Sequence, residues 1–260
     1  MTARYAEFAP RADLASHVAC VWLFEGRDAD EDQRIAPDGC CELIVHRGEP
    51  YQERQADGRL TRQPPSLLAG QLTRPLHLRA EGDVKVVGVR FRTTGAHAYA
   101  GVPMSGLTDR RAPWTAVDLS ADDEAGRLDQ IQDHVAAEIA RHAVPPDPLI
   151  DDAVARLEAG ASVEDLCRET GLSARGLQRR FAVRVGISPR MLAAVIRFRR
   201  VFEALREATT ETWSDAAQAA GYFDHPQMAR DFRRFVGCTP SRFVAARPGL
   251  SVSLVDLPLS

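Results

Sequence analysis

The sequence predicts an α+β protein, in which a small antiparallel β-barrel or sandwich with appended helices precedes an all-helical domain. Short runs rich in β-branched and aromatic residues, separated by turn signals, fill the chain to about Pro113. A proline-rich stretch at 144–148 then interrupts the chain, and apolar residues beyond it recur at helical spacing up to Phe243. With 260 residues, the chain is long enough for two domains that each have a core.

Four runs in the first part predict strands, at 17–24, 41–46, 76–79 and 84–91. Turn signals containing Gly separate them, at 37–39, 47–48, 57–58 and 81–83. Helices are expected next, at 95–100 and 124–142. The second of these carries an apolar stripe formed by Leu128, Ile131, Val135 and Ile139. The stripe fits a dimer interface, which we favour, and it also fits packing on the barrel.

A helix, a Gly-centred turn and a second helix carrying arginines occur twice in the helical part, at about 163–183 and 213–236. Gly171 and Gly221 lie where each first helix must stop, because Gly enters the left-handed conformation without a Cβ penalty. Ser173 and Asp224 then follow as N-caps of the second helices. This is the helix-turn-helix layout, whose second helix can enter the major groove of DNA.

The apolar positions of each module predict a small core, which leaves the polar residues on the outer face of each second helix. That face carries Arg175, Gln178 and Arg179 in the first module, and His225, Gln227 and Arg230 in the second. A helix over 190–206 joins the modules and spans about 25 Å at ~1.5 Å per residue. The two second helices are then about one DNA turn apart, ~34 Å, so that one monomer can read two successive major grooves.

Charge is unevenly divided along the chain. The net charge is −3 overall, but from Gly171 to Arg247 there are fourteen arginines and six acidic residues, a local net charge of +8. The earlier part is correspondingly acidic, as at 27–32 and 122–124. A basic module behind an acidic one is the charge division expected when a DNA-binding domain is attached to another domain.

Residues 219–243, AAGYFDHPQMARDFRRFVGCTPSRF, resemble the signature of the AraC/XylS family of bacterial transcription regulators. In the first module, FAVRVGISP at 181–189 is the parallel stretch. The resemblance covers about 100 of the 260 residues. It implies sequence-specific promoter binding, with base-edge contacts from Arg175, Gln178, Arg179, His225, Gln227 and Arg230. The chain departs from the family at Pro226, where Ser or Gln often stands, so a contact there is lost or moved.

Four further residues are expected to bind phosphate rather than base edges: Ser173, Arg184, Arg233 and Arg234. Such contacts add salt-dependent affinity without sequence information.

The N-terminal part is similar to the sensor half of some family members, in PDGCCELIV at 37–45 and GVRFR at 88–92. Small barrels sometimes hold one small molecule. Four aromatic residues are candidates to line such a cavity: Trp22, Phe24, Phe91 and Tyr99. Plain core packing is the alternative for each of them.

Cys40 and Cys41 lie close to His46 and raise the hypothesis of a metal site or a redox sensor. Adjacent cysteines lack the C-x₂-C spacing of a zinc site, and strand alternation sends their thiols to opposite faces. We therefore expect buried apolar packing at both positions, with no metal and no cofactor. The five cysteines form no framework spacing and indicate a reduced, cytoplasmic protein.

Motifs typical of enzymes are missing from the sequence. A metal-dependent cupin needs a His-x-His pair, another His and a carboxylate, whereas His17, His46, His77 and His97 are isolated along the chain. P-loop, nucleophile-elbow and Cys/His nucleophile patterns are absent. A DNA-repair alkyl acceptor needs a zinc-bound cysteine cluster, which the spacing does not provide. We predict that the protein is not an enzyme.

These observations predict a β-barrel or cupin-like sensor and dimerisation domain at 1–143, a linker at 144–148, a DNA-binding domain at 149–248 and a frayed tail at 249–260. A small-molecule effector in the first domain is expected to control promoter binding or contact with RNA polymerase, and a homodimer is expected. The alternative is a ligand-independent regulator whose N-terminal domain only dimerises or binds a partner protein. No secretory segment or apolar run of ~18 residues is present, which excludes a membrane partner.

Overall fold

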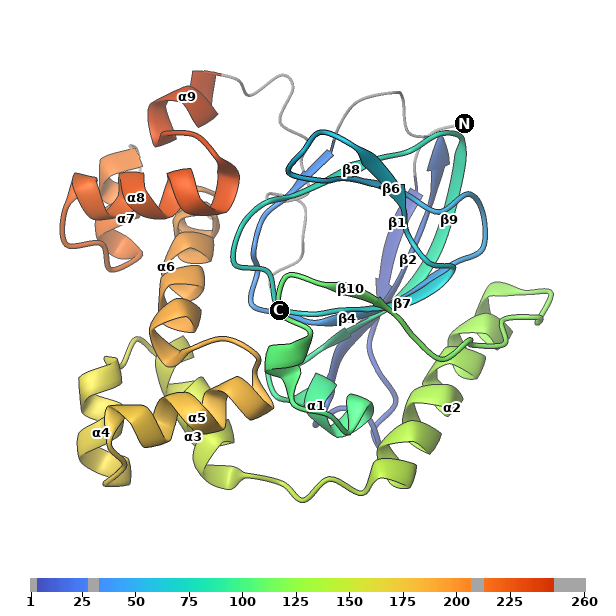
Figure 1. Ribbon diagram of the computed structural model, residues 1–260, viewed down its shortest axis with the longest axis horizontal. Coiled ribbons are helices and arrows are strands. Elements are labelled where there is room, and N and C mark those ends of the chain that lie inside the picture. Colours follow the sequence, from blue (N-terminus) through green and yellow to red (C-terminus); the bar gives the residue numbers. More distant parts are fainter. Residues whose placement is uncertain (1–3, 28–32, 207–212, 246–260) are drawn as a thin grey trace.

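The computed structural model describes residues 4–27, 33–206 and 213–245. A β-rich half and a helical half lie side by side (Figure 1). The strands of the β-rich half are β1 Arg4–Phe8, β2 Val18–Arg27, β3 Gln33–Ile35, β4 Glu42–His46, β5 Gln52–Arg54, β6 Leu60–Arg62, β7 Ser66–Ala69, β8 Leu76–Arg79, β9 Asp83–Phe91 and β10 Arg111–Pro113. The same half contains α1 Gly95–Ala100, the short 3₁₀ helix η1 Met104–Gly106, and α2 Glu124–His142.

The strands form two antiparallel sheets. The first sheet has six strands in the order β1-β2-β9-β4-β7-β10, and the second has four in the order β3-β8-β5-β6. The short strands of the second sheet pair only with one another among the described residues, so of the two expected forms, barrel or sandwich, the two sheets form separate ladders and no closed barrel. The α+β class is confirmed.

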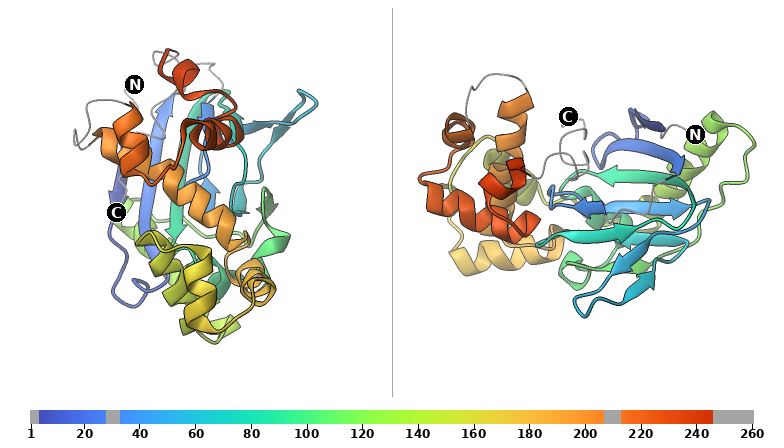
Figure 2. Two further views of the ribbon diagram at one scale, coloured as in Figure 1. Left: turned by 90° about the vertical axis from the view of Figure 1, so that its left-hand side faces the viewer. Right: turned by 90° about the horizontal axis from the view of Figure 1, so that it is seen from above.

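Side chains of the first sheet alternate between two environments, because successive residues of a strand point to opposite faces. On β4 and β9, the face covered by α1 and α2 buries Leu43, Val45, Val87 and Val89 in one apolar core. The opposite face carries Ile44 and Val86 and looks towards the second sheet (Figure 2). The first sheet therefore has a packed core on one side and a separate environment on the other.

The apolar stripe of α2 is used inside the molecule. Ile131 and Val135 are fully buried in the core beneath the first sheet, and Leu128 and Ile139 pack against it. The expectation that this stripe forms a dimer interface is therefore wrong, because the sheet of the same chain already covers it.

Gly88 on β9 allows the ring of Trp22 to approach the strand more closely than any residue with a side chain would permit. A Cβ atom at this position would lie 2.2 Å from the indole ring of Trp22 on the neighbouring strand β2. The absence of a side chain at Gly88 thus lets the Trp22 ring lie across β9 on the side that faces the second sheet.

The helical half consists of α3 Pro148–Glu158, α4 Val163–Thr170, α5 Ala174–Arg184, α6 Pro189–Arg206, α7 Trp213–Ala219, α8 His225–Val236 and α9 Pro240–Ala245. The two helix pairs lie at opposite ends of α6 (Figure 1). Leu192 and Ile196 of α6 belong to the core of α3, α4 and α5. Phe198 and Phe202 of the same helix belong to the core of α7 and α8. One helix therefore supplies both cores.

The helices expected at 95–100 and 124–142 are confirmed, as is the strand at 76–79, and the other three predicted strands recur within a few residues. None of the described helices combines the length and hydropathy that a bilayer crossing requires. The expectation for the tail at 249–260 lies outside the described residues.

Candidate nucleic-acid interface and ligand cavity

The first helix pair is defined by hydrogen bonds at its helix ends. Ser162 and Asp165 form a reciprocal capping box that begins α4, and Gly171 ends it with a left-handed φ of 66°. Ser173 then caps α5, since its Oγ accepts a hydrogen bond from the Gly176 amide at 3.2 Å. These caps fix the direction in which α5 leaves the turn.

The second pair repeats this arrangement. Gly221, with a φ of 87°, follows α7, and the Asp224 side chain accepts a hydrogen bond from the Gln227 amide at 2.6 Å. Pro226 occupies the first turn of α8, where its missing N–H costs nothing. The predicted N-caps, Ser173 and Asp224, are confirmed in both modules.

Five of the six predicted base-contacting residues are exposed on the two second helices: Arg175, Gln178, Arg179, His225 and Arg230. Within the described ranges, none of the three arginines in this group is held by an ion pair. Other arginines of the domain are neutralised internally, as in the Arg197–Asp231 pair at 3.5 Å and the Arg190–Glu164 pair at 3.1 Å. The remaining free positive charge is therefore concentrated on the outer faces of α5 and α8.

The sixth predicted base-contacting residue, Gln227, is less exposed than the other five and is held by a hydrogen bond. It is half-buried, and its Oε1 accepts a hydrogen bond from the Phe223 amide at 3.1 Å. The carbonyl oxygen of this side chain thus satisfies a backbone donor at the start of α8, as a Gln in this position of a helix can.

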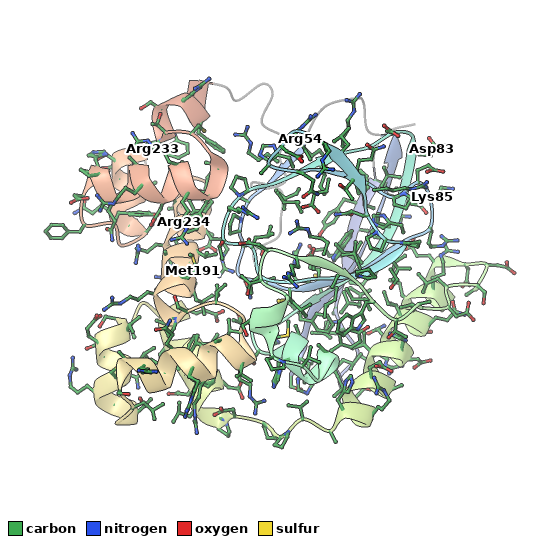
Figure 3. The ribbon with its side chains drawn as sticks, in the orientation of Figure 1. Arg54, Asp83, Lys85, Met191, Arg233 and Arg234 are labelled. Atoms are coloured by element: carbon green, nitrogen blue, oxygen red, sulfur yellow. The ribbon has the colours of Figure 1, made fainter. Side chains whose placement is uncertain are left out.

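The predicted phosphate-contacting residues divide into two groups. Ser173, Arg233 and Arg234 are exposed, and Arg234 also donates from Nε to the Thr73 carbonyl oxygen of the β-rich half at 3.3 Å. Arg233 and Arg234 leave different sides of α8 (Figure 3). Arg184 is half-buried; burial lowers the pKa of His97 of α1, and the nearby charge of Arg184 contributes a smaller lowering. Arg234 and Arg184 therefore face the β-rich half in this structure.

One exposed residue of the interface was not predicted. Phe223 lies directly before α8 and is 94 % exposed. Its neighbour Tyr222 is buried, and the Arg197 guanidinium lies 5.4 Å from the Tyr222 ring centroid. A pair of adjacent aromatic residues in a turn is the sequence signal, because only one of them can point into the small core.

A cavity of about 230 Å³ lies between the two sheets of the β-rich half. Trp22 and Phe24 line it, as predicted, together with Tyr5 and Tyr51. The same prediction is wrong for Phe91 and Tyr99. Their rings stack at 5.0 Å in the core that α1 and α2 cover. Phe91 lies at a position of β9 that points to the other face of the sheet.

The polar part of the cavity wall is built around Arg90 on β9. Its guanidinium contacts Glu42 at 3.0 Å, Glu7 at 3.2 Å and Asp38 at 4.0 Å. Burial raises the pKa of Glu42, while the adjacent Arg90 acts in the opposite direction. At another part of the wall, Arg111 pairs with Glu53 through a hydrogen bond of 2.8 Å.

Cys40 and Cys41 lie in different environments. Cys40 lines the cavity, and Cys41 is buried in the core on the other side of the sheet. Burial raises the pKa of Cys41 to about 12 and that of Cys40 well above its usual value, so both thiols stay protonated at neutral pH. Within the described ranges, no group of three His, Cys, Asp or Glu side chains has the arrangement of a metal site.

The segment between β3 and β4, residues 36–40, connects the cavity with the helical half. Ala36, Asp38 and Cys40 line the cavity, and Ala36 is also buried in the core shared by α6 and α8. Arg199 of α6 donates to the Asp38 carbonyl oxygen at 3.3 Å. On the preceding strand, Arg34 donates to the Val236 carbonyl oxygen at the end of α8 at 2.6 Å.

Two family models match the chain. A helix-turn-helix domain matches residues 166–246, and a domain of unknown function (DUF6597) matches residues 6–113. A search of curated proteins gave no match.

Solved structures of ToxT from Vibrio cholerae share the fold. The apo form of a lysine-to-alanine variant is 10% identical, with a TM-score of 0.51 over 89% of this chain and 98% of that one. ToxT from strain O395 is 9% identical, with a TM-score of 0.51 over 86% of this chain and 97% of that one. ToxT bound to (E)-4-(8-methylnaphthalen-1-yl)but-3-enoic acid is 10% identical, with a TM-score of 0.51 over 86% and 98%.

The matched helix-turn-helix domain contains both helix pairs, and the free basic side chains lie on the helices that such a domain presents to DNA. Residues 166–246 therefore belong to a helix-turn-helix domain, and the chain as a whole shares the fold of ToxT.

Proposed function

We propose that the chain is a cytoplasmic, non-enzymatic regulator that binds promoter DNA and acts on RNA polymerase under the control of a small-molecule effector. Residues 1–143 bind the effector in the cavity between the sheets, and residues 149–248 bind DNA. The observation that carries this proposal is the segment 36–40, which forms part of the cavity wall and packs on α6 at the same time.

In this proposal, α5 and α8 read base edges through their exposed side chains. Arg175, Arg179 and Arg230 suit bidentate contacts with guanine. Phe223 adds an apolar contact beside the start of α8, of the kind that recognises a thymine methyl group. Gln227 keeps its capping role and orients the helix rather than reading a base.

The effector and DNA sites are coupled through β3 and the segment 36–40. A molecule in the cavity contacts Ile35, Ala36 and Asp38, and it therefore acts on the residues that hold α6 and the end of α8. Arg234 joins the two halves at a second point, through Thr73. A ligand changes DNA affinity only by its differential affinity for two arrangements of these contacts.

The fold is compatible with uptake of a small organic molecule, since ToxT has been solved bound to an aromatic butenoic acid. Coupling is tested with the full chain by screening small metabolites in a thermal-shift assay and measuring DNA affinity with each hit. The matched variant is Ile44→Trp, which fills the cavity from β4. We expect hits that stabilise the native chain, alter its DNA affinity and fail to act on the variant.

If millimolar concentrations of every compound leave both melting temperature and DNA affinity unchanged, the ligand-independent alternative is favoured. The N-terminal half would then serve dimerisation or binding of a partner protein. Hits that act equally on the native chain and on Ile44→Trp would place the effector outside this cavity.

A further inference from the structure

We propose that the molecule held in the cavity between the sheets is an organic cation, an ammonium group on a small apolar body. This inference rests on the proposed function, because it takes this cavity as the effector site. The charges of the cavity wall, the aromatic side chains around them and an uncharged histidine each favour this class.

The first argument is the charge balance around Arg90. One guanidinium lies among three carboxylates, of Glu7, Asp38 and Glu42. Arg111, the other arginine of the wall, is matched by Glu53. Asp38 and Glu42 line the cavity, while Glu7 and Glu53 pair with the two arginines from outside its lining, so carboxylates outnumber guanidinium groups around this largely buried wall, where solvent screens charge poorly. A bound cation compensates that excess.

The second argument concerns the donors that a carboxylate ligand would need. Arg90 uses Nε for Glu42 and Nη1 for Glu7, so an anionic ligand would approach a guanidinium whose charge two carboxylates already offset. The Arg111 guanidinium is held by Glu53 in the same way. An anion therefore meets negative charge at this wall and two arginines that are already bound.

The third argument is His46, which is 8 % exposed and lines the cavity. Its Nε2 lies 3.2 Å from Gln63 Oε1, which assigns the ring proton to Nε2. Nδ1 is then an acceptor, and it has no hydrogen-bond partner among the described residues. Burial lowers the pKa of His46, so the ring is neutral and adds no positive charge. His46 therefore does not offset the negative charge of the carboxylates around the wall.

The remaining walls are aromatic and aliphatic. Trp22, Phe24 and Tyr51 present rings, and Ile44 and Val86 present aliphatic groups. Aromatic faces attract a cation through the ring quadrupole, and they also bury an apolar body. The volume of about 230 Å³ is below the roughly 300–1,000 Å³ of drug-sized sites, which restricts the ligand to a small molecule.

The inference is tested with three probes that share one apolar body: phenylpropylamine, phenylpropanol and phenylpropanoate. Binding to the full chain at neutral pH is measured by calorimetry and thermal shift. We expect saturable binding of the amine, weaker binding of the alcohol and the weakest binding of the carboxylate. Glu42→Gln and Asp38→Asn each remove one charge with little change of shape, and each should weaken amine binding about ten-fold or more.

Glu49→Gln is the control, because it removes the same charge from a surface side chain that is 60 % exposed and paired with Arg62. Circular dichroism and melting temperature verify that each variant is folded. If the carboxylate or the alcohol binds more tightly than the amine, and Ile44→Trp blocks that binding, the cation assignment is overturned. The cavity would then still be the effector site. Binding of none of the three at millimolar concentration overturns the assignment, and the metabolite screen then decides the proposed function separately. Equal amine affinity in Glu42→Gln, Asp38→Asn and Glu49→Gln also overturns it.

Discussion

Arg179 on α5 and Arg233 on α8 are both exposed arginines, but their positions predict different roles in DNA binding. Arg179→Ala should relax sequence preference, because loss of a bidentate base contact costs about 1–3 kcal/mol on the cognate site alone. Arg233→Ala should weaken binding to all sequences alike. It should also reduce by about one the slope of the logarithm of the binding constant against the logarithm of salt concentration. Fluorescence anisotropy on a cognate and a scrambled duplex, at several salt concentrations, measures both effects.

Genome-wide mapping of binding sites supplies the cognate duplex for this comparison. Arg168→Ala is a suitable control, because Arg168 is exposed on α4 and paired with Asp165 at 2.6 Å. Equal losses on both duplexes for Arg179→Ala and Arg233→Ala would contradict the assignment of separate roles.

At the scale of the element, Ser173 combines two roles that substitutions can separate. It caps α5, and its hydroxyl is also placed to donate to a phosphate. Ser173→Asp keeps a good N-cap and adds a negative charge, so it should preserve stability and lower DNA affinity. Ser173→Ala should lower the free energy of unfolding by about 1 kcal/mol. Chemical denaturation and duplex titration measure the two quantities.

Ser162→Ala is the matched control, since it removes the cap of α4, a helix that carries none of the proposed base contacts. It should cost a similar free energy of unfolding and leave DNA affinity nearly unchanged in the folded protein. Unchanged DNA affinity in Ser173→Asp would remove Ser173 from the phosphate contacts.

The helix-turn-helix elements could be predicted from the sequence because local chemistry fixes their boundaries. Gly171 and Ser173, for example, end one helix and begin the next without help from distant residues. The strands β5 and β6 were not predicted, since Gln52–Arg54 and Leu60–Arg62 are short, largely polar and depend on pairing across the sheet. Their hydrophobic content is too low to indicate a strand.

The candidate site was predictable to a similar extent. The exposed faces of α5 and α8 follow from helical periodicity, whereas the hydrogen bond that the Phe223 amide donates to the Gln227 side chain does not. In the cavity, Trp22 and Phe24 were predicted, but Arg90 and its three carboxylates were not. They come together from β1, β4, β9 and the segment 36–40, and only the tertiary fold brings these together.

At the scale of the whole molecule, buried and half-buried histidines predict a pH dependence of stability. Burial lowers the pKa of His17, His46, His97 and His134 below the value of about 6.5 that each has when unfolded. The unfolded chain therefore binds more protons as the pH falls below about 6.5, and each such proton removes about 1.4 kcal/mol of stability per pH unit. The melting temperature should fall between about pH 7.5 and pH 5.5.

Glu42 and Asp231, whose pKa values burial raises, act in the opposite direction, but they are two groups against four. His134→Gln removes one of the four titrating histidines and should therefore make the melting temperature depend less on pH. His134 Nε2 lies 3.0 Å from the Tyr99 hydroxyl, a contact that the glutamine amide can retain. A melting temperature that stays constant or rises on acidification would contradict this account.

The two environments of β4 and β9 have a consequence for how such a regulator diversifies. Glu42, Ile44, Val86 and Arg90 face the cavity, while the residues between them hold the core beneath α1 and α2. Neighbouring codons thus serve separate tasks. Substitutions at every second position of these strands can change which metabolite is bound. The intervening residues keep the core, and therefore the fold, unchanged.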